Sequence, residues 1–325
     1  MSKTNLNLQA PSVSVIVPVY GVEAYVGVCA ESLFKQDFPN IEFIFVDDET
    51  PDNSIEVIRQ TLESFPECKD KTLIVSQKNT GLPGARMCGL RHATGDFVIH
   101  VDSDDWVEPD FVSSMVELAL KEDADVVYCD YYQEYESRPS KRVFEGDFFP
   151  CDGTIAAKAM TNSIIRAYMW NKLEKRSLYD LDTLVVPIFG YHEDIVFQSQ
   201  VLSAAQRVVH LDKPLYHYRR RRRGALTAGN VFKTRTASAA NMLHLWSSIP
   251  EDSPVESACG VDILLRAGWY CCIIFRFKML MQYPEVVEFL ADLPYQKWNR
   301  VPLSKQCYVK LCCRIMRRFL SSTPQ

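Results

Sequence analysis

Short apolar runs rich in β-branched residues alternate with helical patterns through the first 130 positions of this 325-residue chain, and no other feature restricts its fold as much. Residues 13–20 read VSVIVPVY and residues 41–46 read IEFIFV. Neither run shows the polar alternation of a strand with one face in water, and both are typical of strands buried on two faces. Apolar residues recur at helical spacing behind each run. The sequence therefore predicts an α/β fold with a mostly parallel sheet flanked by helices.

The same alternation predicts how the rest of the chain is divided. Further strands are expected over residues 72–75, 96–101 and 125–130, a helix around residues 111–118, and a loop over TGLPGAR, residues 80–86. Residues 135–153 resemble a linker in composition. We expect three parts, which are residues 1–130, residues 131–229 as the second half of the same domain, and a helical C-terminal extension over residues 230–325.

Composition excludes several classes of protein. Hydrophobic residues at 47% and charged residues at 24% are ordinary for a globular chain, and a net charge of -5 gives no reason to expect nucleic acid as the partner. The 11 cysteines include no CxxC motif, which favours a reducing cytoplasm. Residues 1–11 do not resemble a signal peptide, and the apolar run at residues 269–275 is too short to span a bilayer. We expect a cytoplasmic protein, soluble or peripheral on the inner face of the membrane.

Polar residues follow the predicted strands at one edge of the sheet. Tyr20 ends the first run, Asp48 follows the second, and Asp102 and Asp104 follow the strand at residues 96–101. The carboxyl ends of strands in an open α/β sheet are where ligands bind. We therefore expect these side chains to line a site.

The triplet DSD, residues 102–104, has two interpretations. Carboxylates two positions apart at a strand end can hold one hard divalent cation, which neutralises a diphosphate. Alternatively the triplet is a solvated turn or helix cap, since a helix follows it.

Other polar groups also have alternatives. Asp194 in YHEDIVF is a candidate general base or an acidic first turn of a helix. The arginines at residues 219–223 can grip phosphate or form a solvated basic face, and no aromatic residue is interleaved among them as in nucleic-acid sites. His217 is a metal ligand or a packed, hydrogen-bonded residue, and Arg86 contacts phosphate or lies on a helix surface.

Taken together and in order, these motifs resemble the inverting family 2 glycosyltransferases of the GT-A fold, of the bacterial type. The likeness runs from about Val13 to Thr227 and rests on VSVIVPVYGVEAYV, FPNIEFIFVDDETPDNS, NTGLPGARMCGLRHATGDFVIHVDSDDWVEPDF, WNKL, HEDIVF and YHYRRRRRGALT.

The resemblance implies a role for each matching residue. It assigns nucleotide-sugar binding to Pro18, Tyr20, Asp48, Arg86, Asp102, Ser103, Asp104 and Arg219. Tyr20 would lie against the base and Asp48 would accept a hydrogen bond from uracil. Asp104 would coordinate Mn²⁺ or Mg²⁺ directly, Asp102 would lie nearer the ribose or sugar, and His217 would be a third metal ligand. Asp194 would be the catalytic base, and Arg219 would belong to a lid over the diphosphate.

The implied activity is transfer of a sugar from a nucleotide-diphosphate donor, a UDP-sugar, to a hydroxyl of a glycan or lipid-linked glycan. The chain departs from the family pattern at Gly21, where Asn is usual, and in DDETPDNS, which replaces DDGSTDNS while Asp48 is retained. The local turn is therefore expected to differ.

Three alternatives apply to parts of this interpretation. A nicotinamide-dependent Rossmann oxidoreductase is excluded, because no G-x-G-x-x-G follows the first strand. A non-catalytic nucleotide-sugar or glycan-binding protein of the same fold is the other candidate function. Residues 310–320, KLCCRIMRRFL, form either a basic amphipathic helix on an anionic membrane surface or a core-packing helix.

Overall fold

The computed structural model describes residues 11–146, 150–220, 231–250, 252–260, 262, 263 and 266. Its strands are β1 (Val13–Val19), β2 (Ile41–Asp47), β3 (Thr72–Ser76), β4 (Phe97–His100), β5 (Trp106–Val107), β6 (Val126–Glu134), β7 (Lys141–Val143), β8 (Lys172–Lys175) and β9 (Val208–Arg219). Its α-helices are α1 (Val26–Phe34), α2 (Ser54–Glu63), α3 (Gly81–His92), α4 (Phe111–Glu122), α5 (Gly153–Thr161), α6 (Glu193–Ala204) and α7 (Val231–Ser248). Short helical turns cover Pro66–Lys71, Arg176–Leu178 and Glu256–Gly260.

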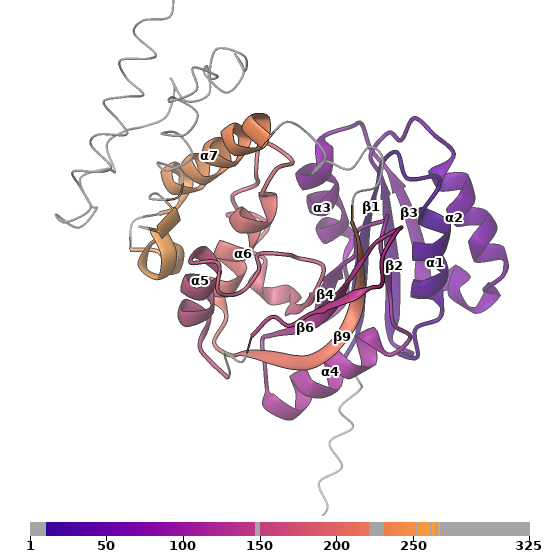
Figure 1. Cartoon of the computed structure of the whole chain (residues 1–325), viewed down its shortest axis with the longest axis horizontal. Coiled ribbons are helices and arrows are strands. Elements are labelled where there is room, and N and C mark those ends of the chain that lie inside the picture. Colours follow the sequence, from indigo (N-terminus) through magenta and orange to yellow (C-terminus); the bar gives the residue numbers. More distant parts are fainter. Residues whose placement is uncertain are drawn as a thin grey trace, which may run out of the picture.

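All of these strands belong to one sheet, in the order β3-β2-β1-β4-β8-β6-β9-β5, with β7 paired to β6 (Figure 1). The first four strands of this order are parallel, and Val13 of β1 pairs with Ile41 on one side and Phe97 on the other. Strand β6 is parallel to β9, whereas β8 and β5 are antiparallel to their neighbours. The predicted α/β class with a mostly parallel sheet is confirmed.

Helices pack on both faces of the sheet because successive residues of a strand point to opposite sides. Val15 and Val17 of β1 belong to a core with residues of α1, α2 and α4, whereas Ile16 belongs to a second core with residues of α3, α5, α6 and α7. Every residue of β1 is buried. The two cores hold the strand ends rigidly, and the candidate site residues follow those ends.

Two segments differ from the sequence prediction. The predicted loop over residues 80–86 is wrong for residues 81–86, because α3 begins at Gly81 directly after Thr80. Pro83 is tolerated in its first turn, where a backbone N–H has no helical partner to lose. The linker-like stretch contains β7, which pairs antiparallel with β6.

Strand β8 was not predicted, although it lies in the middle of the sheet between β4 and β6. Its sequence is KLEK, yet Lys172 and Glu174 are buried. Burial of these polar residues is compensated by hydrogen bonds, which a hydrophobicity pattern does not detect.

Some expectations concern residues outside the described part of the chain. No helix within the described residues is long and apolar enough to cross a membrane. The described cysteines are all free: Cys29, Cys68, Cys88, Cys129, Cys151 and Cys259. Helix α7 lies at the start of the expected C-terminal extension, and the division of the chain into three parts stays a prediction. Residues 269–275, residues 310–320 and arginines 221–223 lie outside the described residues.

We expect Gly89→Ala to destabilise the protein. A Cβ at this position of α3 would lie 2.2 Å from Cγ2 of Ile16, a buried β-branched side chain of β1 that cannot rotate away. Such overpacking costs about 1–3 kcal/mol, which a lowered melting temperature would reveal. Gly190→Ala is the control, because its Cβ would meet atoms only at 3.9 Å. Equal melting temperatures for the two variants would contradict this account of α3 packing.

Candidate functional site

The candidate site lies at the edge of the sheet where β1, β2 and β4 end. Pro18 belongs to the buried end of β1, Tyr20 follows this strand and is 50% exposed, and Asp48 follows β2 and is buried. Asp48 Oδ1 accepts hydrogen bonds from Gln77 Nε2 at 2.8 Å and from the backbone N–H of Thr80 at 2.9 Å. An exposed aromatic residue and a carboxylate that is held by the chain itself therefore follow two adjacent strands.

The departures from the family pattern lie in the turns next to these residues. Gly21 has φ +64°, which glycine adopts freely, and Glu49 has φ 58°, which is strained for a residue with a Cβ. Glu49 Oε2 accepts a hydrogen bond from the N–H of Asn79 at 3.2 Å. The left-handed Glu49 therefore links the end of β2 to the loop before α3, and the expected difference from the family's turn stays a prediction.

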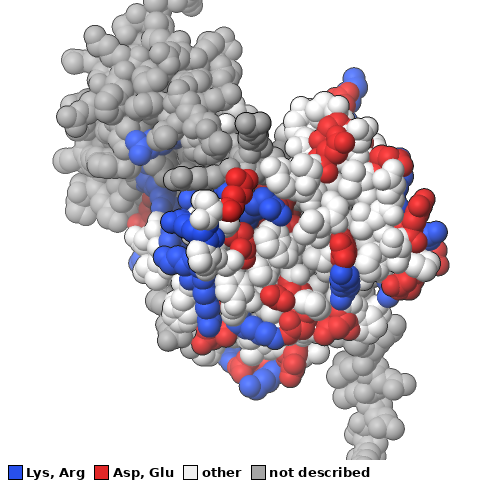
Figure 2. All heavy atoms as spheres, turned by 45° about the vertical axis from the view of Figure 1, so that its right-hand side comes forward, with Lys and Arg blue, Asp and Glu red and all other residues white. Residues whose placement is uncertain are grey.

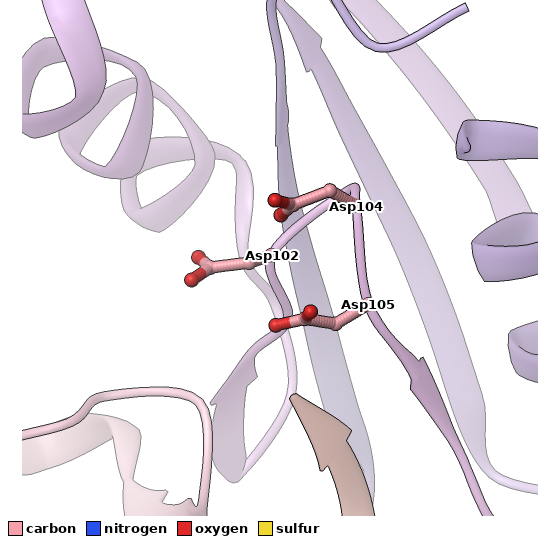
Figure 3. Close-up of side chains that lie close together, drawn as sticks. All are labelled: Asp102, Asp104 and Asp105. Carbon is pink, nitrogen blue, oxygen red and sulfur yellow. The ribbon is translucent and has the colours of Figure 1, made fainter. Parts of the chain in front are cut away.

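Three carboxylates gather directly after β4. Oxygens of Asp102, Asp104 and Asp105 all lie within 4.8 Å of one another, and Figure 3 shows the side chains extending to the same side of the loop. Ser103, between the first two, is buried. The loop concentrates negative charge at one place.

Asp105 has a structural role that the sequence did not reveal. It is 1% exposed, and it accepts hydrogen bonds from Tyr216 Oη at 2.9 Å and from the N–H of Arg219 at 2.7 Å. The Tyr216 hydroxyl also accepts a hydrogen bond from the N–H of Asp102 at 3.1 Å. Burial, followed by the charges of Asp104 and Asp102, raises the pKa of Asp105 well above its usual range. Asp105 therefore anchors the acidic loop to β9.

The other two carboxylates fit a hard divalent cation. Asp102 is 25% exposed at its side chain, and carboxylate oxygens are the ligands that Mg²⁺ and Mn²⁺ accept. The charges of Asp104 and Asp102 add to the effect of burial in raising the pKa of Asp105, as expected for carboxylates that repel one another. A bound cation would relieve this repulsion.

Arg86 lies beneath this loop and is 1% exposed. Its Nη2 donates to Asp102 Oδ1 at 2.9 Å and lies 3.6 Å from Glu193 Oε1 and 4.0 Å from Asp194 Oδ1. The structure thus places this arginine between the loop after β4 and the first turn of α6. Residues 92 positions apart, 102 and 194, meet through one guanidinium group.

The Glu193–Asp194 pair begins α6, after His192 in a left-handed conformation with φ 54°. Burial, and then the charge of Asp194, raises the pKa of Glu193 well above its usual range. Burial also raises the pKa of Asp194, although Arg86 and Lys172 oppose that effect. Arg86 opposes this rise in pKa at both residues, and Lys172 opposes it at Asp194.

The ring nitrogens of His217 contact two glutamates and not the carboxylates of the acidic loop. Nδ1 lies 2.8 Å from Glu134 Oε1 and Nε2 lies 2.9 Å from Glu108 Oε1. The ring is stacked between Trp106 and Tyr132, with both centroids at 5.0 Å. The expected third metal ligand thus has both nitrogens engaged by glutamates, and metal ligation by His217 stays a prediction.

Arg219, by contrast, does reach the loop. Its Nε donates to the carbonyl of Asp104 at 2.9 Å, and its guanidinium lies 4.7 Å from the Trp106 ring and 5.1 Å from the Tyr25 ring. This arginine holds the end of β9 against the acidic loop. Its expected position over a diphosphate stays a prediction.

Lys172 is a residue whose importance the sequence reasoning missed. It lies in WNKL and is buried, and its Nζ donates to the carbonyls of Arg166 and Tyr168 and to Asn171 Oδ1. Burial lowers its pKa, and the carboxylates of Glu145, Glu174 and Asp194 oppose this. The WNKL motif drew attention to this segment, but only the fold shows that the charge of Lys172 acts on Asp194.

Comparison with known families identifies the chain. Residues 14–189 match the model of the family described as Glycosyl transferase family 2. The chain belongs to glycosyl transferase family 2. This match includes the loop after β4, and the Glu193–Asp194 pair lies just beyond it.

Relatives within the family are similar over part of their length. The chain is 34% identical over 221 residues to a putative glycosyltransferase, EpsH of Bacillus subtilis, which covers 65% of this chain and 62% of EpsH. It is 31% identical over 221 residues to the glycosyltransferase GlyA of Streptococcus pneumoniae, covering 65% of this chain and 31% of GlyA. The chain thus spans less than two thirds of the length of these relatives.

Solved structures share the fold at low identity. The crystal structure of S. aureus TarS 1–349 in complex with UDP-GlcNAc has a TM-score of 0.69 and 18% identity, covering 95% of this chain and 90% of the other. The mannosyltransferase PcManGT from Pyrobaculum calidifontis, in complex with GDP-Man and Mn²⁺, has a TM-score of 0.54 and 16% identity, covering 97% and 89%. The fold of this family 2 chain is therefore the GT-A fold.

We expect Tyr216→Phe to destabilise the protein by about 1–3 kcal/mol, because the buried Asp105 loses a hydrogen-bond donor and the N–H of Asp102 loses an acceptor. A lowered melting temperature measures the effect. Tyr132→Phe is the matched control, since the contact of Tyr132 with His217 is made by its ring. If both variants had the melting temperature of the wild type, the hydrogen bonds of the Tyr216 hydroxyl would not contribute to stability.

Proposed function

We propose that this protein transfers a sugar, with inversion of configuration, from a nucleotide-diphosphate donor to a hydroxyl of a glycan or lipid-linked glycan acceptor. The observation that carries the proposal is the convergence on Arg86 of Asp102 at 2.9 Å and of Glu193 and Asp194 at 3.6 and 4.0 Å. Asp102 belongs to the acidic loop that would bind a cation, and Asp194 would accept a proton. Their contacts with one arginine bring these two functions together, as this reaction requires.

The donor in this proposal is a UDP-sugar. The nucleobase would lie on the exposed ring of Tyr20, next to Pro18, with its ring N–H near Asp48. The diphosphate and sugar would lie toward Asp102, Ser103 and Asp104. TarS and PcManGT, which share the fold, are described with UDP-GlcNAc and GDP-Man respectively, and these ligands support a nucleotide-sugar site of this kind.

Asp104 and Asp102 would hold Mn²⁺ or Mg²⁺. The Mn²⁺ described with PcManGT and the three clustered carboxylates support this assignment. When bound, the cation would neutralise charge that develops on the departing diphosphate. His217 would be a third ligand only if one of its ring nitrogens left the glutamate that it now contacts.

Asp194 would accept the proton from the acceptor hydroxyl. The oxygen would then attack the anomeric carbon from the face opposite the diphosphate, the bond to the leaving oxygen would break, and the configuration would invert. Arg86, at 4.0 Å, opposes the effect of burial on the pKa of Asp194 and so favours its ionised form. Arg219 at the end of β9 would face the diphosphate from the opposite side of the loop.

Calorimetry tests the donor half of the proposal. We expect UDP to bind in the presence of Mn²⁺, binding to disappear on chelation with EDTA, and Asp104→Asn to abolish the metal-dependent part. Asp123→Asn is the control, because Asp123 is a fully exposed aspartate at the end of α4 and its left-handed backbone tolerates Asn. If UDP bound equally well without the metal and to Asp104→Asn, the proposal of a cation at this site would be wrong.

A transfer assay tests the base. We expect Asp194→Asn to retain UDP binding and to lower the turnover of a UDP-sugar by about 10²–10⁴-fold, the usual contribution of general acid–base catalysis. Release of UDP in the presence of acceptor is the measurement. Turnover by Asp194→Asn at the wild-type rate would falsify the base assignment.

A lipid-linked acceptor implies contact with the inner membrane surface, and the basic residues 310–320 support such contact by their composition alone. We expect the full chain to float with vesicles containing phosphatidylglycerol and to float less when Arg314, Arg317 and Arg318 are changed to Gln, by about 1 kcal/mol of binding for each arginine. Equal flotation of the variant and the wild type would show that these residues do not attach the protein.

A further inference from the structure

Stacked aromatic rings fill the space between the acidic loop and the segment before β8. The Trp170 ring lies 4.5 Å from Tyr168, 4.3 Å from Tyr216 and 5.4 Å from Tyr218, with interplanar angles of 16–20°. Trp170 and Tyr216 are buried, whereas Tyr168 and Tyr218 are partly exposed. The stack therefore presents two tyrosines at the surface and keeps a rigid base beneath them.

The position of Tyr218 on β9 explains which side of the strand it faces. Tyr216 and Tyr218 are two residues apart, so they share one face of β9, toward Trp170. His217 and Arg219 share the other face, toward Trp106. Both faces of β9 therefore contact the acidic loop, through Arg219 on one and Tyr216 on the other. The face of Tyr216 also carries Tyr218, which is the partly exposed end of the stack on this strand.

The first partly exposed ring belongs to Tyr168, which is linked to the candidate base through Lys172. Lys172 Nζ donates to the carbonyl of Tyr168, and the same buried ammonium group is stabilised by the charge of Asp194. Burial raises the pKa of Tyr168, and the Asp194 carboxylate raises it further. Tyr168 therefore lies within electrostatic reach of Asp194.

The second partly exposed ring, Tyr218, has its centroid 6.2 Å from that of Tyr168. Burial raises its pKa to about 12, with further contributions from Tyr168, Asp105 and Asp102. An acceptor hydroxyl must reach both the base and the anomeric carbon near Asp102. The stack adjoins the acidic loop, because Tyr216 within it hydrogen-bonds to Asp105 and to the N–H of Asp102.

Two arginines belong to the segments that carry these rings, Arg166 two residues before Tyr168 and Arg220 two residues after Tyr218. Arg220 lies 5.7 Å from the Tyr218 ring centroid, and both Arg166 and Arg220 lower the pKa of Tyr168. Among the described residues, neither arginine forms an ion pair with a carboxylate. Figure 2 shows more widely that Lys and Arg gather on one part of the described surface while Asp and Glu dominate other parts.

We propose that Tyr168 and Tyr218 form the acceptor subsite, on which a pyranose ring lies with its C–H face against the aromatic rings, and that Arg166 and Arg220 bind an anionic group on that acceptor. Aromatic faces bind apolar C–H surface, and guanidinium groups bind carboxylates or phosphates in two-pronged hydrogen bonds. The acceptor is therefore an acidic glycan, carrying either a uronate or a phosphate. This inference rests on the proposed function, since it deepens the same site.

Saturation-transfer NMR with the full chain, UDP and Mg²⁺ tests the subsite without requiring turnover. The probes are methyl β-glucuronide, glucose 1-phosphate and the neutral methyl β-glucoside. We expect transfer to the ring protons of at least one acidic probe and at least a 5-fold weaker signal for the neutral one. The acidic probe with the stronger signal identifies the anion as carboxylate or phosphate. Equal signals from the neutral probe and both acidic probes would overturn the anionic acceptor.

Variants then assign the signal to these residues. Tyr218→Ala should abolish the transfer, and Arg220→Gln should weaken the acidic probe by about 10-fold while leaving the neutral probe unchanged. Arg138→Gln is the matched control, because Arg138 also lies over a tyrosine ring, at 3.5 Å from the Tyr135 centroid.

Calorimetry of UDP with Mg²⁺ on the same samples separates the two claims. Wild-type protein that binds UDP but gives no transfer to any probe, or a signal that survives Tyr218→Ala, would overturn the subsite alone. Loss of UDP binding in the wild type would instead overturn the proposed function. Melting temperatures close to that of the wild type exclude unfolding as the cause of a lost signal.

Discussion

Like charges held close together in a buried setting are the constraint on which the rest of this site depends. Asp102 and Asp105 after β4 and the acidic pair that begins α6 all lie near one point. Carboxylates in such a setting repel unless a proton, a hydrogen-bond donor or a cation compensates each one. Two donors from β9 hydrogen-bond to Asp105, a raised pKa favours the protonated form of Glu193, and the Arg86 guanidinium lies beside Asp102 and Asp194.

Strand β9 distributes these tasks between its two faces. Tyr216 fastens the acidic loop through its hydroxyl and supports the aromatic stack through its ring. Arg219, on the opposite face, holds the carbonyl of Asp104. Because β9 is parallel to β6 over most of its length, these contacts are fixed by the sheet rather than by a loop. The acidic loop is therefore positioned from a strand that lies more than 100 residues later in the chain.

The sequence predicted those features that periodicity and local motifs encode. Apolar runs predicted β1, β2 and β4, and the polar residues at their ends predicted the edge at which Tyr20, Asp48 and Asp102 lie. It did not predict β8, because Lys172 and Glu174 are buried by virtue of specific partners that a hydrophobicity pattern cannot reveal. The roles of Asp105 and of the glutamates around His217 were missed for the same reason, since each depends on contacts between segments far apart in the sequence.

The central place of β8 also has a consequence for how the chain is synthesised. Strand β4 pairs with β1 on one side and with β8 on the other, and these pairings join residues 97–99 to residues 173–175. Until the ribosome has released residue 175, the buried, apolar β4 is an open edge whose peptide groups lack partners on that side. Nascent chains with such an edge are prone to pair with one another. The late synthesis of β8 therefore leaves the first half of the domain with an unpaired strand edge during its own translation.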